Sequence, residues 1–201
     1  CDYCFYCDEA QKRTQESFGY MSEQTLKNII RKTMLRAEGM ISYTYQGGEP
    51  TLRRKLDFFK KAIEFQNQYN RNHVQVQNAL QTNGYAITEE WCQFFKDNHF
   101  LIGLSVDGTE EIHNSMRHTH SGSGTFARVN QTAMLMDEYG VDYNILTVVT
   151  PKIRGEYSGN DMALIKGGDG IINNILPVWI PLEKNMGKPR IPFRQRYMDS
   201  F

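Results

Sequence analysis

The stretch MISYTYQGGEP, residues 40–50, sets the pattern of the whole chain. Residues 40–45 are rich in aromatic and β-branched side chains, which is typical of a β-strand, and a polar turn with two glycines follows. The same arrangement returns in VQVQNALQTNG at residues 74–84 and in FLIGLSVDG at residues 100–108. Three predicted strands, at 40–45, 74–80 and 100–104, therefore each run into a polar, glycine-bearing turn.

Helices are expected between and around these strands. Apolar side chains recur at helical spacing in residues 22–36, 56–69 and 126–139, and Thr88 is placed to cap another helix. A fourth strand is predicted at 141–149, and a weaker one at 176–180. Helix and strand alternate with a period of about 30 residues, which is typical of βαβ units and a parallel sheet. The fold class that we expect is α/β, a partial (β/α) barrel of the TIM type with parallel strands.

This architecture predicts where the chemistry lies. Right-handed crossovers place the carboxyl ends of parallel strands at one edge of the sheet, and ligand sites of α/β folds form at that edge. The turns QGGEP, QTNG and SVDG all follow strands, so their polar groups should converge there.

Composition limits the possible partners. The 201 residues are 40% hydrophobic and 23% charged, as in globular proteins. Lys plus Arg and Asp plus Glu both number 23, so the formal net charge is zero, which argues against nucleic-acid or membrane-surface binding. The sequence shows neither an apolar run long enough to span a bilayer nor a signal peptide, so we expect a cytoplasmic protein.

We expect one domain over residues 1–201. Five of the six prolines lie at or beyond position 151, and clear periodicity fades there. Residues 151–201 are therefore expected to form the less regular end of the partial barrel, with a short helix at 162–165. The chain begins at Cys1 rather than at a methionine, so we expect its true N-terminus to lie upstream.

Three of the four cysteines are crowded at one end. Cys1, Cys4 and Cys7 lie within seven residues, which predicts metal or cluster ligation in a reducing compartment rather than a disulfide framework. Thiolates favour iron–sulfur clusters or zinc. Free thiols in a frayed terminus are the simpler alternative. Cys92 is expected to pack a helix face as a small hydrophobic residue.

A zinc site would need a further ligand. The candidates are His113, His118 and His120.

The segment CDYCFY, residues 1–6, resembles the end of the radical S-adenosylmethionine cluster motif C-x3-C-x2-C, in which an aromatic residue precedes the last cysteine. The segments QGGEPTL (46–52), LQTNG (80–84) and LIGLSVDGTEEIHNSMR (101–117) are similar to those of one subfamily, the anaerobic sulfatase-maturating enzymes. The similarity runs from residue 1 to about 150 and persists weakly to about 188. Four motifs in the right order identify the chain as a member of this family and imply its radical SAM core.

The resemblance implies a [4Fe-4S] cluster and S-adenosyl-L-methionine as cofactors. Cys1 and Cys4 would be the second and third cluster ligands, and the first would lie four residues before Cys1, outside this chain. Cys7 is not at a ligand position of the family, although it could substitute for a ligand in a rearranged loop. Tyr3 resembles the aromatic residue whose backbone touches adenine.

The turns carry the remaining roles that the resemblance implies. Gly47 and Gly48 would meet the amino group of the cofactor, and Glu49 would support that turn. Ser105 would hydrogen-bond the cofactor, and Arg117 would pair with its carboxylate, for which a planar two-pronged donor is suited.

Other positions have less specific roles. Gln46 is similar to a family residue that contacts the substrate peptide. Asn83 either belongs to the site or caps a turn beside Gly84. Asp107 is expected only to shape the turn with Gly108.

The chain also departs from the family. A weak alignment puts Trp179 where the family has a leucine against adenine. The catalytic aspartate and the cysteine-rich domain of the family have no counterpart here, so the chain looks like the amino-terminal half of such an enzyme.

The implied reaction is reductive cleavage of S-adenosylmethionine. The resulting 5′-deoxyadenosyl radical takes a hydrogen from Cβ of a Cys or Ser in a sulfatase, and oxidation gives Cα-formylglycine. The implied partners are a sulfatase polypeptide and a reductant such as flavodoxin or ferredoxin. Three alternatives remain open, namely a radical enzyme acting on another peptide, a zinc-binding module, and a non-catalytic fragment.

Overall fold

The fold is a single parallel sheet covered by helices. The computed structural model describes residues 1–4, 6, 12–15, 19–53, 56–149 and 175–179. The strands stand in the order β1-β2-β3-β4-β5, and every neighbouring pair is parallel. Their bounds are β1 (Met40–Tyr45), β2 (Gln75–Thr82), β3 (Phe100–Ser105), β4 (Tyr143–Val149) and β5 (Ile175–Trp179).

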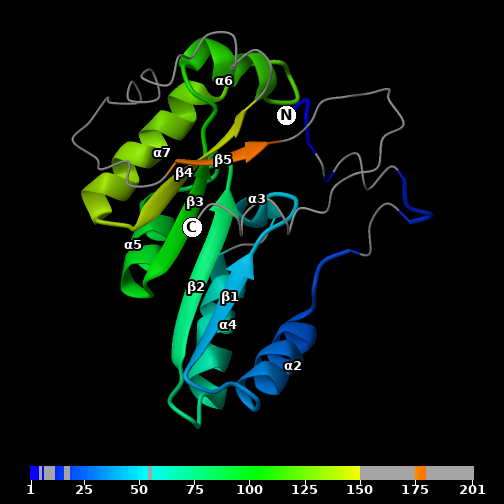
Figure 1. The fold of residues 1–201 in the computed structure, drawn as a ribbon, viewed down its shortest axis with the longest axis vertical. Helices are drawn as coiled ribbons and strands as arrows, with labels where there is room; N and C mark the ends of the chain where they lie inside the picture. The colour runs from blue at the N-terminus through cyan, green and yellow to red at the C-terminus, as the bar shows by residue number, and fades with distance from the viewer. Residues whose placement is uncertain (5, 7–11, 16–18, 54–55, 150–174, 180–201) are drawn as a thin grey trace, which may run out of the picture.

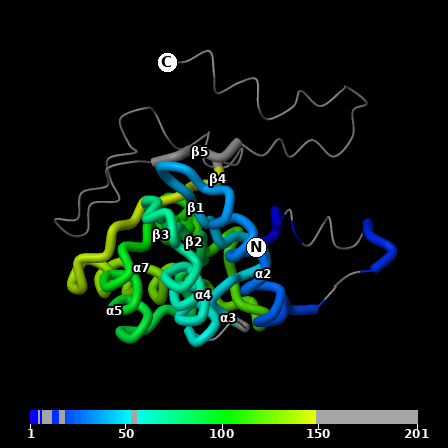
Figure 2. Tube along the Cα trace, turned by 90° about the horizontal axis from the view of Figure 1, so that it is seen from below, coloured from blue at the N-terminus to red at the C-terminus, as the bar shows by residue number. Residues whose placement is uncertain are grey.

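The helices lie between the strands in the chain and cover one face of the sheet (Figures 1 and 2). They are α2 (Glu23–Met34), α3 (Pro50–Arg53), α4 (Leu56–Tyr69), α5 (Glu89–Asp97), α6 (Glu110–Met116) and α7 (Phe126–Tyr139). Because the strand order follows the chain without reversal, right-handed crossovers place successive helices on the same face. This confirms the expected class, an α/β fold forming a partial (β/α) barrel of the TIM type.

Most predicted boundaries hold, and the shifts have local causes. The strand predicted from Val74 begins at Gln75, because the Asn70 side chain binds both backbone groups of Val74, at 2.8 and 2.9 Å. The strand predicted from Val141 begins at Tyr143, because the Val141 amide donates a hydrogen bond to the Met136 carbonyl at the end of α7, 2.8 Å away.

Two short helices, α3 and α6, were not predicted. Thr88 occupies the N-cap position of α5, but its hydroxyl makes no capping hydrogen bond, so that part of the prediction was wrong. The helix expected at 162–165 lies outside the described residues.

An aromatic core joins the sheet to α4 and α5. Phe59, Trp91, Phe95 and Phe100 are each at most 7% exposed, and their rings pack at centroid distances of 5.4–5.5 Å. Such tilted and edge-on pairs are favourable beyond the area that they bury. Cys92 is fully buried in this cluster, which confirms its predicted packing role, and burial raises the pKa of its thiol to about 11.

The opposite face of the sheet is not covered by these helices. Along β3, Phe100, Ile102 and Leu104 are buried, whereas Leu101 is 45% exposed. A Cβ on Gly103 would lie 2.7 Å from Leu146 and 3.7 Å from Gln81, so these side chains share the open face with Gly103. Since strand side chains alternate, Ser105 at the end of β3 belongs to this face too.

A buried histidine ties α6 to β3 and α7. His113 on α6 is 0% exposed. Its Nδ1 lies 3.3 Å from the Asp107 amide, which donates to it, and its Nε2 donates to the Thr125 hydroxyl at 3.0 Å. That hydroxyl donates to the Arg117 carbonyl at 3.1 Å. Burial, reinforced by the charge of Arg117, lowers the pKa of His113 to about 4, so the ring is neutral.

This burial predicts a pH-dependent stability. Below pH 6.5 the unfolded chain protonates His113, but the folded chain does not until about pH 4, so the folded state loses stability as pH falls through this window. The slope due to this group approaches about 1.4 kcal/mol per pH unit. His113→Gln keeps a donor and an acceptor but does not titrate, so urea unfolding at pH 4.5–7.5 should show a shallower slope for it than for the wild type.

The exposed His120→Gln variant is the matched control. An unchanged slope in His113→Gln would show that the folded chain protonates His113 as readily as the unfolded chain does.

Candidate functional site

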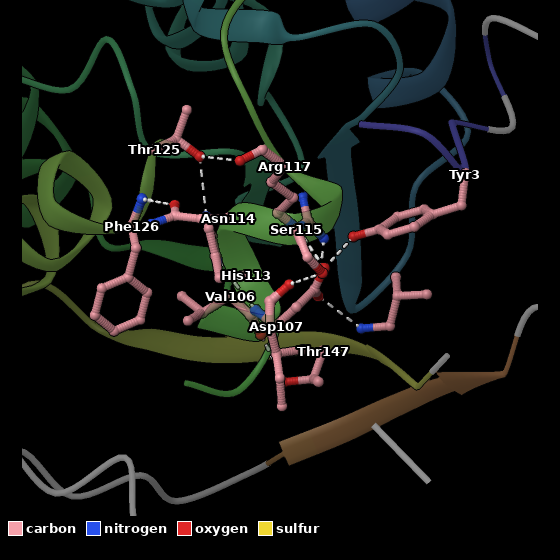
Figure 3. A network of polar contacts seen from close by, with 12 residues as sticks. Tyr3, Val106, Asp107, His113, Asn114, Ser115, Arg117, Thr125, Phe126 and Thr147 are labelled. Atoms are coloured by element: carbon pink, nitrogen blue, oxygen red, sulfur yellow. Dashed lines mark hydrogen bonds and ion pairs between the residues drawn. The ribbon is translucent and has the colours of Figure 1, made fainter. Parts of the chain in front are cut away.

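The cysteine-bearing segment lies at the carboxyl edge of the sheet. The Asp2 amide donates to the Met116 carbonyl at 3.1 Å, and the Tyr3 hydroxyl donates to the Asp107 carboxylate just beyond β3 (Figure 3). The ring of Tyr6 approaches within 3.5 Å of the position that a Cβ on Gly47 would take. The segment therefore spans from the end of β3 to the turn after β1, as the sequence-based hypothesis requires.

Cys1 and Cys4 belong to one turn. The Cys4 amide lies 3.2 Å from the Cys1 carbonyl, to which it donates. Both thiols are free of disulfides, with Cys1 exposed and Cys4 half-buried. Two cysteines on one turn, accessible to a ligand, fit the donor set of an iron–sulfur cluster, with further ligands to come from elsewhere. Cys7 lies outside the described residues.

The glycine turn after β1 is open on the side of Gly48, whereas Tyr6 lies against Gly47. Gly47 and Gly48 have φ values of 109° and 58°, in the region that favours glycine. A Cβ added to Gly48 would meet no atom of a described residue within 4 Å. The turn therefore presents its backbone groups to an approaching ligand.

The Glu49 carboxylate fastens this turn to the end of β2. It accepts hydrogen bonds from the Thr51 and Thr82 hydroxyls, each at 2.7 Å, and from the Asn83 amide at 2.6 Å. These contacts fit a supporting role for Glu49. The Asn83 side chain accepts from the Tyr85 amide at 2.9 Å, which is the turn-capping role that the sequence left open.

Two polar side chains at strand ends have no hydrogen-bond partner among the described residues. Gln46, directly after β1, is exposed, whereas Ser105 is only 7% exposed. A buried hydroxyl without a partner costs free energy, and native structures usually satisfy such groups. Ser105 therefore fits the hydrogen bond to a ligand that the resemblance implies.

Asp107 has a larger part than the expected turn-shaping one. It is 0% exposed and accepts from Arg117 through Nε at 2.7 Å and Nη2 at 3.2 Å, and from the Val148 amide at 3.0 Å. With the Tyr3 hydroxyl this makes four donors around one buried carboxylate (Figure 3). Burial raises the pKa of Tyr3, so its hydroxyl stays protonated and donates.

Sequence reasoning missed both Asp107 and His113 as organising residues. Asp before Gly at a strand end indicates a turn, and nothing in the spacing tells that the carboxylate is buried. The nearest available signal was the basic Arg117 ten residues later.

The zinc alternative finds no support in the described part of the chain, where no three His, Cys, Asp or Glu side chains are grouped to hold a metal ion. Both ring nitrogens of His113 are hydrogen-bonded, and Nε2 of His118 pairs with Asp2 at 2.8 Å. No helix in the described ranges has the length and apolar character needed to cross a membrane.

Comparison with known proteins gives consistent matches. A cysteine-type anaerobic sulfatase-maturating enzyme of Clostridium perfringens is 43% identical over 150 residues, which cover 75% of this chain and 40% of that protein. A serine-type anaerobic sulfatase-maturating enzyme of Bacteroides thetaiotaomicron is 37% identical over 151 residues, covering 74% of this chain and 36% of that protein. The chain thus spans about two fifths of the length of these relatives.

A solved structure, described as native anSMEcpe with bound AdoMet and Kp18Cys peptide, superposes with a TM-score of 0.72 at 40% identity. It covers 78% of this chain and 41% of that one. The model of the radical SAM superfamily matches residues 2–157, from the cysteine segment to beyond β4. A match over most of the chain, together with the convergence of the cysteine segment and the glycine turn at one sheet edge, shows that the chain belongs to the radical SAM superfamily.

Proposed function

We propose that this chain binds a [4Fe-4S] cluster and S-adenosyl-L-methionine and serves the conversion of a Cys or Ser in a sulfatase to Cα-formylglycine. The supporting observation is the meeting, at the same sheet edge, of the cysteine segment, the Gly47–Gly48 turn and the Ser105 hydroxyl, which has no hydrogen-bond partner among the described residues. The named activities of the relatives supply the reaction.

Each residue has a defined task in this proposal. The Cys1 and Cys4 thiolates hold iron, and the Gly47 and Gly48 backbone receives the amino group of the cofactor. Together, cluster and cofactor supply one-electron chemistry that removes a hydrogen atom from the substrate. Ser105 offers a hydroxyl that no described residue hydrogen-bonds, and Glu49 holds the glycine turn in place through Thr82 and Asn83.

Arg117 and Tyr3 have groups left for the cofactor. Asp107 occupies Nε and Nη2 of Arg117, while Nη1 donates no hydrogen bond to a described residue, so that edge suits the cofactor carboxylate. The Tyr3 hydroxyl is engaged by Asp107, which leaves its backbone to face adenine.

The substrate side is less fully defined. Gln46 is exposed at the end of β1 and suits contact with a peptide. Trp179 stands where the family has a leucine against adenine, and the proposal assigns it no contact. A single domain over residues 1–201, a reductant such as flavodoxin or ferredoxin, and a cytoplasmic location remain predictions.

The activity is tested with the complete gene product, reconstituted anaerobically with iron and sulfide. We expect 5′-deoxyadenosine on reduction with S-adenosylmethionine present, and formylglycine in a sulfatase peptide with Cys or Ser at the target position, read by mass spectrometry. Formation of 5′-deoxyadenosine without formylglycine on either peptide would favour an enzyme that modifies another peptide. Stoichiometric zinc without iron would overturn the cluster itself.

Ser105→Ala tests the unpartnered hydroxyl. The substitution removes a buried polar group that has no partner in the described part of the chain, so the free energy of unfolding should stay the same or rise slightly. Losing one hydrogen bond to the cofactor should weaken S-adenosylmethionine binding by about 1 kcal/mol, roughly fivefold. Equilibrium dialysis measures the affinity and urea unfolding the stability; reduced stability with wild-type affinity would assign Ser105 to the fold alone.

Gly48→Ala tests the open turn, with Gly39→Ala as the matched control. Both glycines have positive φ, 58° and 65°, and at both a Cβ would meet none of the described atoms within 4 Å. Each substitution should therefore cost about 1 kcal/mol of stability through backbone strain. Gly39 precedes β1 at the opposite end of the strand, so only Gly48→Ala should also weaken cofactor binding. Equal affinities in the two variants would remove the Gly47–Gly48 turn from the cofactor site.

A further inference from the structure

Asp107 joins parts of the chain that are far apart in sequence. Its carboxylate accepts from Tyr3 in the cysteine segment, from Arg117 after α6 and from the Val148 amide on β4. Asp107 itself follows β3 directly. Four separate segments therefore meet on one fully buried carboxylate.

The pairing with Arg117 is geometrically strict. Each carboxylate oxygen of Asp107 accepts a hydrogen bond from the guanidinium, and the Arg117 side chain is only 11% exposed. Side-on pairing fixes the plane of the guanidinium as well as its position. The ring of Tyr3 lies against the same group, with 5.3 Å between its centroid and Cζ of Arg117.

The main chain around this pair is held as well. The Asp107 amide donates to His113, and the Thr125 hydroxyl bridges His113 Nε2 and the Arg117 carbonyl. Arg117 is thus fixed at its backbone and at its guanidinium, both through partners of Asp107. Because it is held in this way, the Arg117 guanidinium keeps the edge that bears Nη1 in a fixed orientation.

We propose that Asp107 is a positioning residue that couples the two halves of the site, so that the cysteine segment and the cofactor-facing edge of Arg117 are placed together. The inference rests on the proposed function and deepens it. Through Tyr3 the carboxylate sets where the cluster ligands Cys1 and Cys4 stand. Through Arg117 it sets where the cofactor carboxylate binds.

The coupling is tested in the complete gene product, reconstituted anaerobically, with Asp107→Asn and Tyr3→Phe. Asparagine is nearly the same size, but its amide nitrogen meets donors where the carboxylate oxygen accepted them. Tyr3→Phe removes only the hydroxyl, leaving the ring and backbone. Asp142→Asn, an exposed position at the other end of β4, is the matched control.

Two measurements are made besides activity. Equilibrium dialysis measures the affinity for S-adenosylmethionine, and a chelator challenge measures the rate of iron loss. We expect Asp107→Asn to weaken S-adenosylmethionine binding about tenfold and to speed iron loss about tenfold. Tyr3→Phe should change each quantity in the same direction about threefold, and Asp142→Asn should match the wild type. The Asp107→Asn/Arg117→Lys double variant should bind S-adenosylmethionine much better than the product of the single effects implies, because both changes disrupt one unit.

The contrary results are distinct. The coupling is overturned if the affinity loss of the double variant equals the product of the two single losses. It is also overturned if Asp107→Asn changes the affinity for S-adenosylmethionine without changing the rate of iron loss, or the reverse. If Asp107→Asn does not fold, Tyr3→Phe decides, since wild-type values of both quantities would overturn it. A wild-type protein that binds neither iron nor S-adenosylmethionine overturns the proposed function and this inference with it, whereas unchanged variants of a competent wild type overturn this inference alone.

Discussion

The buried ion pair between Asp107 and Arg117 is the interaction on which the arrangement of the site depends. A carboxylate removed from water is tolerated only when its oxygens are fully hydrogen-bonded and its charge is paired. Here the bonds come from three other segments, so the condition for burying the charge is also the condition for assembling the sheet edge. The stability of the pair and the placement of the cysteine segment cannot be separated.

Glu49 does similar work at the neighbouring strand ends. Its carboxylate links the turn after β1 to Thr82, the last residue of β2, and to Asn83 beyond it, while Asp107 links the end of β3 to β4. Neighbouring parallel strands are not joined by tight hairpins, because each connection between them is a long crossover that contains a helix. The carboxylates of Glu49 and Asp107 therefore hold together the strand ends that carry the glycine turn and Ser105.

Local physics explains how much of the fold the sequence predicted. The bounds of β1 follow from its aromatic and β-branched residues and those of α4 from apolar periodicity, and the structure reproduces both. The errors occur where a side chain or a helix end competes for backbone groups, as Asn70 does at Val74 and the end of α7 does at Val141. The short helix α6 was missed because seven residues show too little periodicity to distinguish helix from loop.

By itself the sequence determined the parallel α/β architecture, the placement of polar turns after strands, and the cysteine motif that marks the superfamily. These depend on periodicity and on short spacings, which are local properties of the chain. Only the tertiary structure decided that Ser105 is buried with no partner among the residues described, that His113 is neutral, and that Asp107 unites four segments. Burial and hydrogen-bond satisfaction depend on residues far apart in the chain, such as Tyr3 and Asp107, which are separated by 104 positions, and such separations leave no periodic trace in a single sequence.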